Sequence, residues 1–95
     1  MKSTRDKKVK EELDHQIDLL TKKFLYEVYK QIRIKKMRRA ELAALLQVSP
    51  GYLSQLFHNK KPLTFTMLVR FQQALHIEFE IKTRSHDEQK TKNEN

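Results

Sequence analysis

The chain has 95 residues, which is enough for one domain built around a single core. It contains one glycine, two prolines and no cysteine, so the composition favours helices over a many-turned β fold and excludes disulfides and zinc-thiolate sites. The start of the chain lacks an apolar signal segment, and no run approaches the roughly 18 apolar residues that a membrane span requires. We therefore expect a cytoplasmic protein that makes no membrane contact.

The formal net charge of +8 is unevenly distributed along the chain. Residues 1–10 carry a net charge of +4, residues 11–30 carry −2, and residues 31–48 carry +4. No Asp or Glu occurs between Leu42 and Ile77. Positive charge therefore concentrates on the centre of the chain, where it would attract a polyanion. A solvated surface that binds nothing could carry the same charge. The charge alone therefore does not predict polyanion binding, and a sequence motif is needed as well.

The first predicted helix follows a polar start. Residues 1–10 are basic and lack apolar periodicity, which predicts a disordered arm. Over Glu11–Lys35 an apolar residue recurs every three or four positions, as on one face of a helix. The positions of this stripe are Leu13, Ile17, Leu20, Phe24, Val28 and Ile32. Two arrangements are open: the whole stripe packs inside one subunit, or Leu13, Ile17 and Leu20 form a dimer contact.

Two short helices separated by a tight turn are predicted next. The second helix covers residues 38–46, and the third runs from Pro50 to about His58. Ser49 is a good N-cap for the third helix, and Pro50 fits the first helical position, where the missing N–H has no partner to lose. Asn59 tolerates the left-handed conformation that often follows the last turn of a helix.

A fourth helix is predicted over Phe65–Leu75, with Thr64 as its N-cap. The residues expected on its core face are Phe65, Leu68, Val69, Phe71 and Leu75, with Gln72 in part. This helix would complete a small bundle with the three before it.

The apolar period changes to two after the fourth helix, which predicts a β-strand at residues 77–82. Its apolar positions are Ile77, Phe79 and Ile81. A lone strand needs a partner for its backbone hydrogen bonds, and the same strand of a second subunit would supply one. The alternative is an irregular extended tail lying on the helices. Residues 83–95 are polar and are predicted to be a disordered tail.

The stretch AELAALLQVSPGYLSQLFHNKK, residues 40–61, resembles the helix-turn-helix of the XRE/phage-repressor family. The matching positions are Leu42-Ala43 in the second helix, Val48-Ser49 at the end of the turn, Tyr52-Leu53-Ser54 in the recognition helix and Lys60 after it. The likeness covers about residues 28–76. With the first helix and the strand, it predicts an all-α, lambda repressor-like bundle of four to five helices, whose C-terminal strand pairs in a dimer. The expected domain is 11–82, with the helix-turn-helix at 38–59.

The chain departs from the family pattern at several positions. Gln47 stands where the family usually has glycine, and a left-handed backbone there would cost on the order of 1 kcal/mol. Arg39 replaces the family's glutamine, and its guanidinium would suit a phosphate and brace the third helix. Pro50 and Gly51 cannot reach a base edge with a side chain. Gln55 can pair bidentately with adenine. The residues expected to read bases directly are Gln55, Ser49 and Tyr52, with Arg38 or Arg39 as further candidates, and DNA shape is the alternative source of specificity.

The resemblance and the expected outward face of the third helix together imply a DNA-binding surface. Its predicted residues are Arg38, Arg39, Ser49, Pro50, Gly51, Tyr52, Ser54, Gln55, His58, Lys60 and Lys61. Small Ala43 would allow the second and third helices to approach closely at the turn. The four histidines share no metal-ligand spacing, so neither a metal site nor a cofactor is predicted.

Three functions are open at this stage. The resemblance implies a transcriptional repressor that binds double-stranded DNA as a homodimer, is cytoplasmic, and is nucleoid-associated when bound. A second possibility is an antitoxin, which would also contact a toxin protein through the surplus of the first helix or the extended segment at residues 77–82. A third is an interaction module without DNA activity. An enzyme is not expected, because there is no cysteine, no convergent set of histidine and carboxylate, and no glycine-rich phosphate loop.

Overall fold

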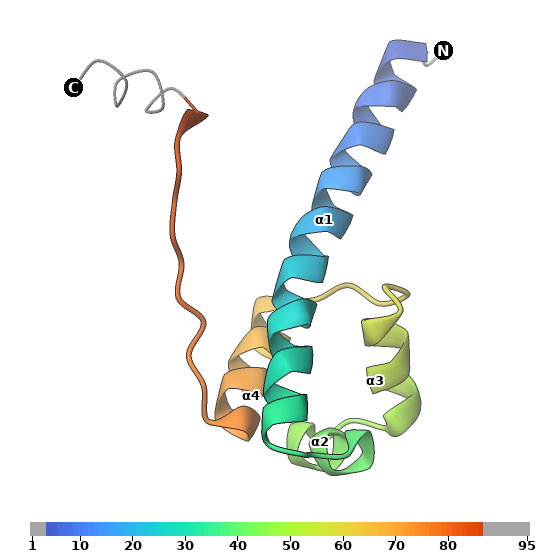
Figure 1. Cartoon of the computed structure of the whole chain (residues 1–95). Coiled ribbons are helices and arrows are strands. Elements are labelled where there is room, and N and C mark those ends of the chain that lie inside the picture. The colour runs from blue at the N-terminus through green and yellow to red at the C-terminus, as the bar shows by residue number, and fades with distance from the viewer. Residues whose placement is uncertain (1–3, 87–95) are drawn as a thin grey trace, which may run out of the picture.

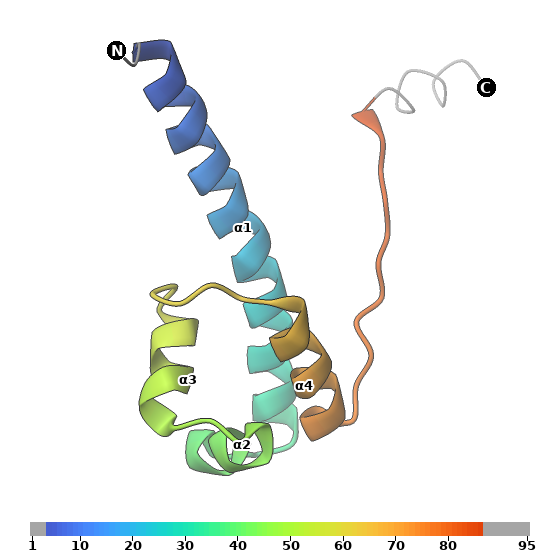
Figure 2. The ribbon, with the colours of Figure 1, turned by 180° about the vertical axis from the view of Figure 1, so that it is seen from behind.

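The computed structural model describes residues 4–86, and this part of the chain folds into four helices. They are α1 (Thr4–Ile34), α2 (Arg39–Leu46), α3 (Pro50–Phe57) and α4 (Phe65–Leu75). The three short helices gather around the C-terminal end of α1, and the N-terminal half of α1 projects away from them (Figure 1). The opposite view shows the same projection (Figure 2). None of these four helices has the length and apolar character needed to cross a bilayer.

The core lies where the last three turns of α1 meet the short helices. Its buried residues are Leu25, Val28, Ile32, Leu42, Ala43, Leu46, Leu53, Leu56, Phe57, Met67, Phe71 and Leu75. All four helices contribute to it, so no helix of the bundle is stable without the others. Burial of one such Leu or Phe side chain contributes about 1.5–3 kcal/mol.

Helix α1 begins at Thr4, seven residues before the predicted start. The prediction of a disordered arm at residues 1–10 is therefore wrong for residues 4–10, and residues 1–3 lie outside the described part of the chain. The segment contains no glycine or proline, and its lysines are good helix formers, so nothing in it ends the helix.

The apolar stripe of α1 divides into two parts. Val28 and Ile32 lie in the core as predicted, together with Leu25, which the stripe did not include. The three residues nearer the N-terminus, Leu13, Ile17 and Leu20, are more than half exposed. The arrangement in which the whole stripe packs inside one subunit is therefore wrong, because the short helices reach only the C-terminal part of α1.

The turn between α2 and α3 uses the caps that the sequence predicts. The Ser49 hydroxyl accepts a hydrogen bond from the Tyr52 N–H at 3.0 Å, and Pro50 occupies the first turn of α3. Gln47 has φ 60° and ψ 42°, the left-handed conformation expected to incur strain. Its N–H closes the end of α2 by donating to the Ala44 carbonyl at 3.1 Å.

Replacing Gln47 with glycine is expected to raise the free energy of unfolding. Glycine adopts the left-handed conformation without a Cβ clash, and its greater freedom in the unfolded chain offsets part of the gain. A net increase of about 0.5–1 kcal/mol should appear in urea denaturation. The matched control is Gln73→Gly inside α4, which should lower stability by about 1 kcal/mol. Equal effects at the two positions would contradict the assignment of strain to Gln47.

Helix α4 begins as predicted but turns a different face to the core. The Thr64 hydroxyl caps it by accepting from the Met67 N–H at 3.1 Å. Phe71 and Leu75 are buried, whereas Phe65 is 85% exposed and Val69 is 48% exposed. The assignment of Phe65 and Val69 to the core is wrong, because they lie on the far side of the helix from Phe71. Met67 takes the core position instead.

The segment after α4 is extended and forms no strand within the described part of the chain. The Phe79 N–H donates to Gln72 Oε1 at 2.8 Å, and the Phe79 ring meets the Phe24 ring edge-on at 5.4 Å between centroids. In the single chain the segment is thus an extended tail, as in the second alternative, but it lies on the helices only through Ile77 and Phe79, and Ile81 is 85% exposed. Pairing with a second subunit stays a prediction. Residues 87–95 of the predicted tail lie outside the described part.

Candidate nucleic-acid interface

Helix α3 turns a polar face away from the core. Its buried residues are Leu53, Leu56 and Phe57, all on one side. The residues on the other side are Ser49, Pro50, Gly51, Gln55, His58 and Asn59, which are exposed, and Tyr52 and Ser54, which are partly buried. This is the face that the sequence predicts as outward. It carries no Asp, Glu, Lys or Arg, so a duplex groove would meet hydrogen-bonding groups there without a fixed charge.

The N-terminal end of α3 offers an open backbone. Within residues 4–86, a Cβ built on Gly51 would meet only the Ser49 Oγ, at 3.9 Å, so no packing among these residues requires glycine there. The absence of a side chain instead allows a ligand to approach the backbone closely. The Ser49 oxygen is engaged as the N-cap, and its hydroxyl hydrogen stays available to donate.

The side chains along the rest of α3 differ in how firmly they are held. His58 Nδ1 lies 2.7 Å from the Ser54 carbonyl oxygen, so this ring is tied to the last turn of its own helix. Gln55 is exposed in the middle of the face. Its amide is the group on this face best suited to a base edge, because Gln presents a donor and an acceptor side by side.

Basic residues lie near the polar face in two groups. Arg38 and Arg39 are exposed at the start of α2, and Lys60 and Lys61 are exposed in the loop after α3. The Lys60 N–H donates to the Gln55 carbonyl at 2.8 Å, which fixes the start of this loop against the helix. Long cationic side chains near such a face reach the phosphates on either side of a groove.

Arg39 also holds the helices together. Its Nη2 donates to the Tyr29 hydroxyl at 3.1 Å, and its guanidinium carbon lies 5.0 Å from the centre of the Phe57 ring. The Tyr29 and Phe57 rings stack at 4.6 Å between centroids. Arg39 therefore bridges α1 and α3 from the start of α2, which is the bracing geometry expected from its sequence position.

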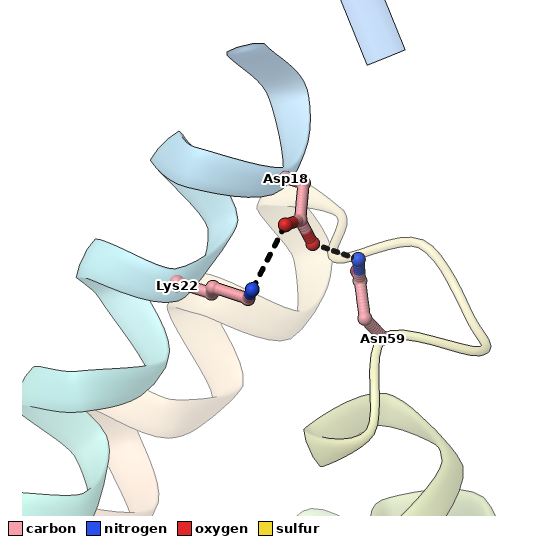
Figure 3. Close-up of polar contacts among 3 residues, drawn as sticks. All are labelled: Asp18, Lys22 and Asn59. Atoms are coloured by element: carbon pink, nitrogen blue, oxygen red, sulfur yellow. Dashed lines mark hydrogen bonds and ion pairs between the residues drawn. The ribbon is translucent and has the colours of Figure 1, made fainter. Parts of the chain in front are cut away.

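A contact that the sequence did not indicate ties the loop after α3 to α1. The Asn59 side chain donates to Asp18 Oδ1, and the other Asp18 oxygen pairs with Lys22 Nζ at 3.0 Å (Figure 3). Asn59 has φ 62°, the left-handed geometry predicted for it. Because Asp18 and Asn59 are 41 residues apart, no local sequence pattern points to their contact. It fixes the position of Lys60 relative to α1.

Removing this contact is expected to destabilise the domain. Asp18→Ala should lower the free energy of unfolding by about 1 kcal/mol relative to Asp14→Ala, and the melting temperature by about 4–8 °C. Asp14 is an exposed residue of the same helix, so the comparison cancels the gain in helix propensity that alanine brings. Thermal unfolding followed by circular dichroism measures both variants. Equal melting temperatures would show that the Asp18–Asn59 contact contributes nothing.

Arg70 is a basic residue near α3 that the predicted site did not include. Its Nη1 donates to the Leu46 carbonyl at 3.2 Å, which ties α4 to the end of α2. It lines a shallow surface hollow with Ser49, Tyr52 and Thr66, beside the N-terminal end of α3. The signal for it was the acid-free stretch from Leu42 to Ile77, which contains Arg70.

The residues predicted for dimerisation lie outside the polar face of α3. Leu13, Ile17 and Leu20 are exposed on the projecting half of α1. In the extended segment Ile81 is exposed, whereas Ile77 and Phe79 are half-buried against the helices. The two sets lie on the same side of the bundle, since a groove is lined by Leu20 together with Ile81.

Four helices in which α2 and α3 meet at a short turn define a helix-turn-helix domain, with α3 in the recognition position. The Helix-turn-helix family model matches residues 30–81, and the chain belongs to this family, of the XRE/lambda repressor-like kind. Domains of this family are DNA-binding regulatory domains. No curated protein and no solved structure matches the chain significantly.

Proposed function

We propose that the protein is a sequence-specific transcriptional regulator that binds a palindromic operator as a homodimer through α3. The observation that carries this proposal is the exposed, uncharged polar face of α3, with exposed cationic residues at the start of α2 and in the loop after α3. Such a face fits the major groove, while the cations near it reach the flanking phosphates. Nothing in this role calls for a catalytic group or a cofactor.

Each part of the face has a distinct task in the proposed complex. Gln55 reads an adenine through its amide, which discriminates against the wrong base by about 1–3 kcal/mol. Gly51 and Ser49 bring the backbone of the first turn close to the DNA, with no long side chain between. Lys60 and Lys61 neutralise phosphates and set the position of the helix without reading sequence.

The test compares two alanine variants of the full chain on DNA selected by the protein from genomic fragments. Gln55→Ala removes one base contact from each subunit and is expected to reduce the preference for the selected sequence over random DNA by about 30- to 10⁴-fold. Lys60→Ala is expected to weaken binding to all DNA alike and to lower the salt dependence of log K by about 1.8, which is about 0.9 for each subunit. Fluorescence anisotropy at several salt concentrations gives both quantities.

Gln73→Ala is the matched control, because Gln73 is an exposed glutamine on α4 and is not one of the residues of the proposed face. It should leave both sequence preference and affinity unchanged. If Gln55→Ala and Lys60→Ala also leave binding unchanged, α3 is not the reading helix and the proposal fails.

A second candidate function is an antitoxin that also regulates its own operon. The apolar side chains on the projecting half of α1 favour it, because a toxin could cover them. Co-expression with the product of a neighbouring gene separates the two functions. An antitoxin would rescue growth from a toxic neighbour, and the rescue would be lost with Ile17→Glu, whereas a plain regulator would not restore growth.

A further inference from the structure

We propose that α1 of a second copy lies antiparallel in the groove between α1 and the extended segment at residues 77–82. This inference rests on the proposed function and specifies how its dimer is built. It unites the two surfaces expected to dimerise, the projecting helix and the C-terminal segment, in one interface.

The apolar side chains of this surface are continuous. Leu13, Ile17 and Leu20 share one face of α1 and are 58%, 53% and 57% exposed. The groove continues that face, and its lining residues are Leu20, Lys23, Phe24, Glu27, Phe79, Glu80, Ile81 and Lys82. A projecting helix is marginal in water without such a face being covered. The extended segment leaves the end of α4 and rises on the same side of the bundle as the projecting half of α1, with its chain direction opposite to that of α1 (Figures 1 and 2). Its residues 79–82 form the second wall of the groove.

The charges favour a second copy of the chain as the occupant, in an antiparallel orientation. The end of the groove nearest the bundle carries an excess of acid, since Glu27, Glu78 and Glu80 line an adjoining hollow there and only Glu27 has an ion pair among the described residues, with Lys30 Nζ at 3.0 Å. The free end of α1 is basic, with exposed side chains at Lys7 and Lys10. An antiparallel arrangement brings this basic end onto the acidic end of the other copy. A parallel one would set lysine against lysine and glutamate against glutamate.

Helical geometry gives the register of the pair. One ridge of α1 carries a lysine, an isoleucine and a phenylalanine seven residues apart, and the neighbouring ridge carries two leucines and a glutamate at the same spacing. In antiparallel packing the two ridges interlock. Each residue on one copy of α1 then lies level with a residue on the other copy. These layers pair Lys10 with Glu27, Leu13 with Phe24, and Ile17 with Leu20, and each pair occurs twice because the dimer is symmetric. In this register Val28 of one copy lies level with residue 9 of the other, which sets the two bundles about 29 Å apart along the helices.

Disulfide trapping tests this arrangement in the full chain, which has no cysteine of its own. Lys10→Cys and Glu27→Cys are made separately, mixed and oxidised with copper phenanthroline. The mixture is expected to give a covalent dimer containing one of each variant. Neither variant alone should cross-link, because two copies of either position lie about 25 Å apart in the antiparallel pair, beyond the roughly 7 Å that a disulfide spans.

The matched control mixes Glu11→Cys with Tyr26→Cys, which lie at the same levels on the opposite face of α1, and no cross-link is expected. Charge reversal gives a second measurement, since Lys10→Glu should weaken dimerisation roughly tenfold and Glu27→Lys in the same chain should restore it. Self-cross-linking of Lys10→Cys, or no cross-link in the mixture, overturns the proposed interface. Operator binding by the unmodified chain is measured alongside. If that binding persists while the cross-link fails, only the interface is wrong, and if both fail the proposed function is wrong too.

Discussion

Replacing Phe71 with alanine is expected to lower the free energy of unfolding by about 3–5 kcal/mol, the largest loss of stability among the proposed substitutions. Phe71 is fully buried, and its ring lies 6.5 Å from that of Phe57, so it joins α4 to the recognition helix. Truncating a buried phenylalanine costs about 3–5 kcal/mol through lost burial and the cavity left behind. Domains of this size have about 5–15 kcal/mol in total. Because the helices around the core are short, few other buried side chains remain to offset the loss of the Phe71 ring.

Phe65→Ala is the matched control, since it removes the same side chain from the same helix. Phe65 is 85% exposed, so its loss should change the free energy of unfolding by less than about 0.5 kcal/mol. Urea denaturation followed by circular dichroism measures both variants. Comparable losses at the two positions would mean that the face of α4 toward the core is misassigned.

Phe65 and Phe71 illustrate which features of the fold can be predicted from the sequence and which cannot. The existence and approximate bounds of α2, α3 and α4 follow from local signals, because Ser49 and Thr64 cap helices through contacts three residues away. The face that α4 turns inward is decided by the other helices. Phe65 and Phe71 are equally apolar, so only the packed structure distinguishes them.

The length of α1 was underestimated for a related reason. A basic, polar start lacks the apolar periodicity that marks an amphipathic helix, yet nothing in residues 4–10 breaks a helix that begins there. Apolar periodicity indicates which residues of a helix pack against another part of the protein. The helix itself continues for as long as the helix propensity of its residues allows. The exposure of Leu13 and Ile17 could not be read from the stripe, because a stripe does not reveal how far the other helices reach.

The candidate interface was predictable where it depends on one helix. The outward face of α3, including Gln55, follows from its period and its resemblance to the family, and the strain expected at Gln47 is present in its φ of 60°. Contacts between distant segments were not predictable. The link between Asp18 and Asn59 and the bond from Arg70 to the end of α2 join residues that no spacing rule connects.

Replacing Ile17 with glutamate is expected to abolish tight operator binding while leaving the helix-turn-helix folded. Ile17 is 53% exposed and is not one of the buried core residues, so the bundle should keep its stability. In the proposed dimer, however, residue 17 packs against Leu20 of the other copy. A glutamate there would be buried between the two helices as an unpaired charge, and the chain would become monomeric. A dimer that binds both half-sites of an operator has about 10²- to 10⁴-fold higher affinity than a monomer that binds one half-site. The monomeric variant would lose this factor.

Leu19→Glu provides the control for this change, because Leu19 is an exposed leucine on the opposite side of α1 and should leave both the dimer and the operator affinity intact. Sedimentation velocity gives the oligomeric state, and fluorescence anisotropy gives affinities for the full operator and for a single half-site. The prediction requires a selective loss, in which Ile17→Glu binds the half-site as the unmodified protein does and loses affinity only for the full operator. An Ile17→Glu protein that stays dimeric with full operator affinity would show that the projecting half of α1 plays no part in pairing the two recognition helices.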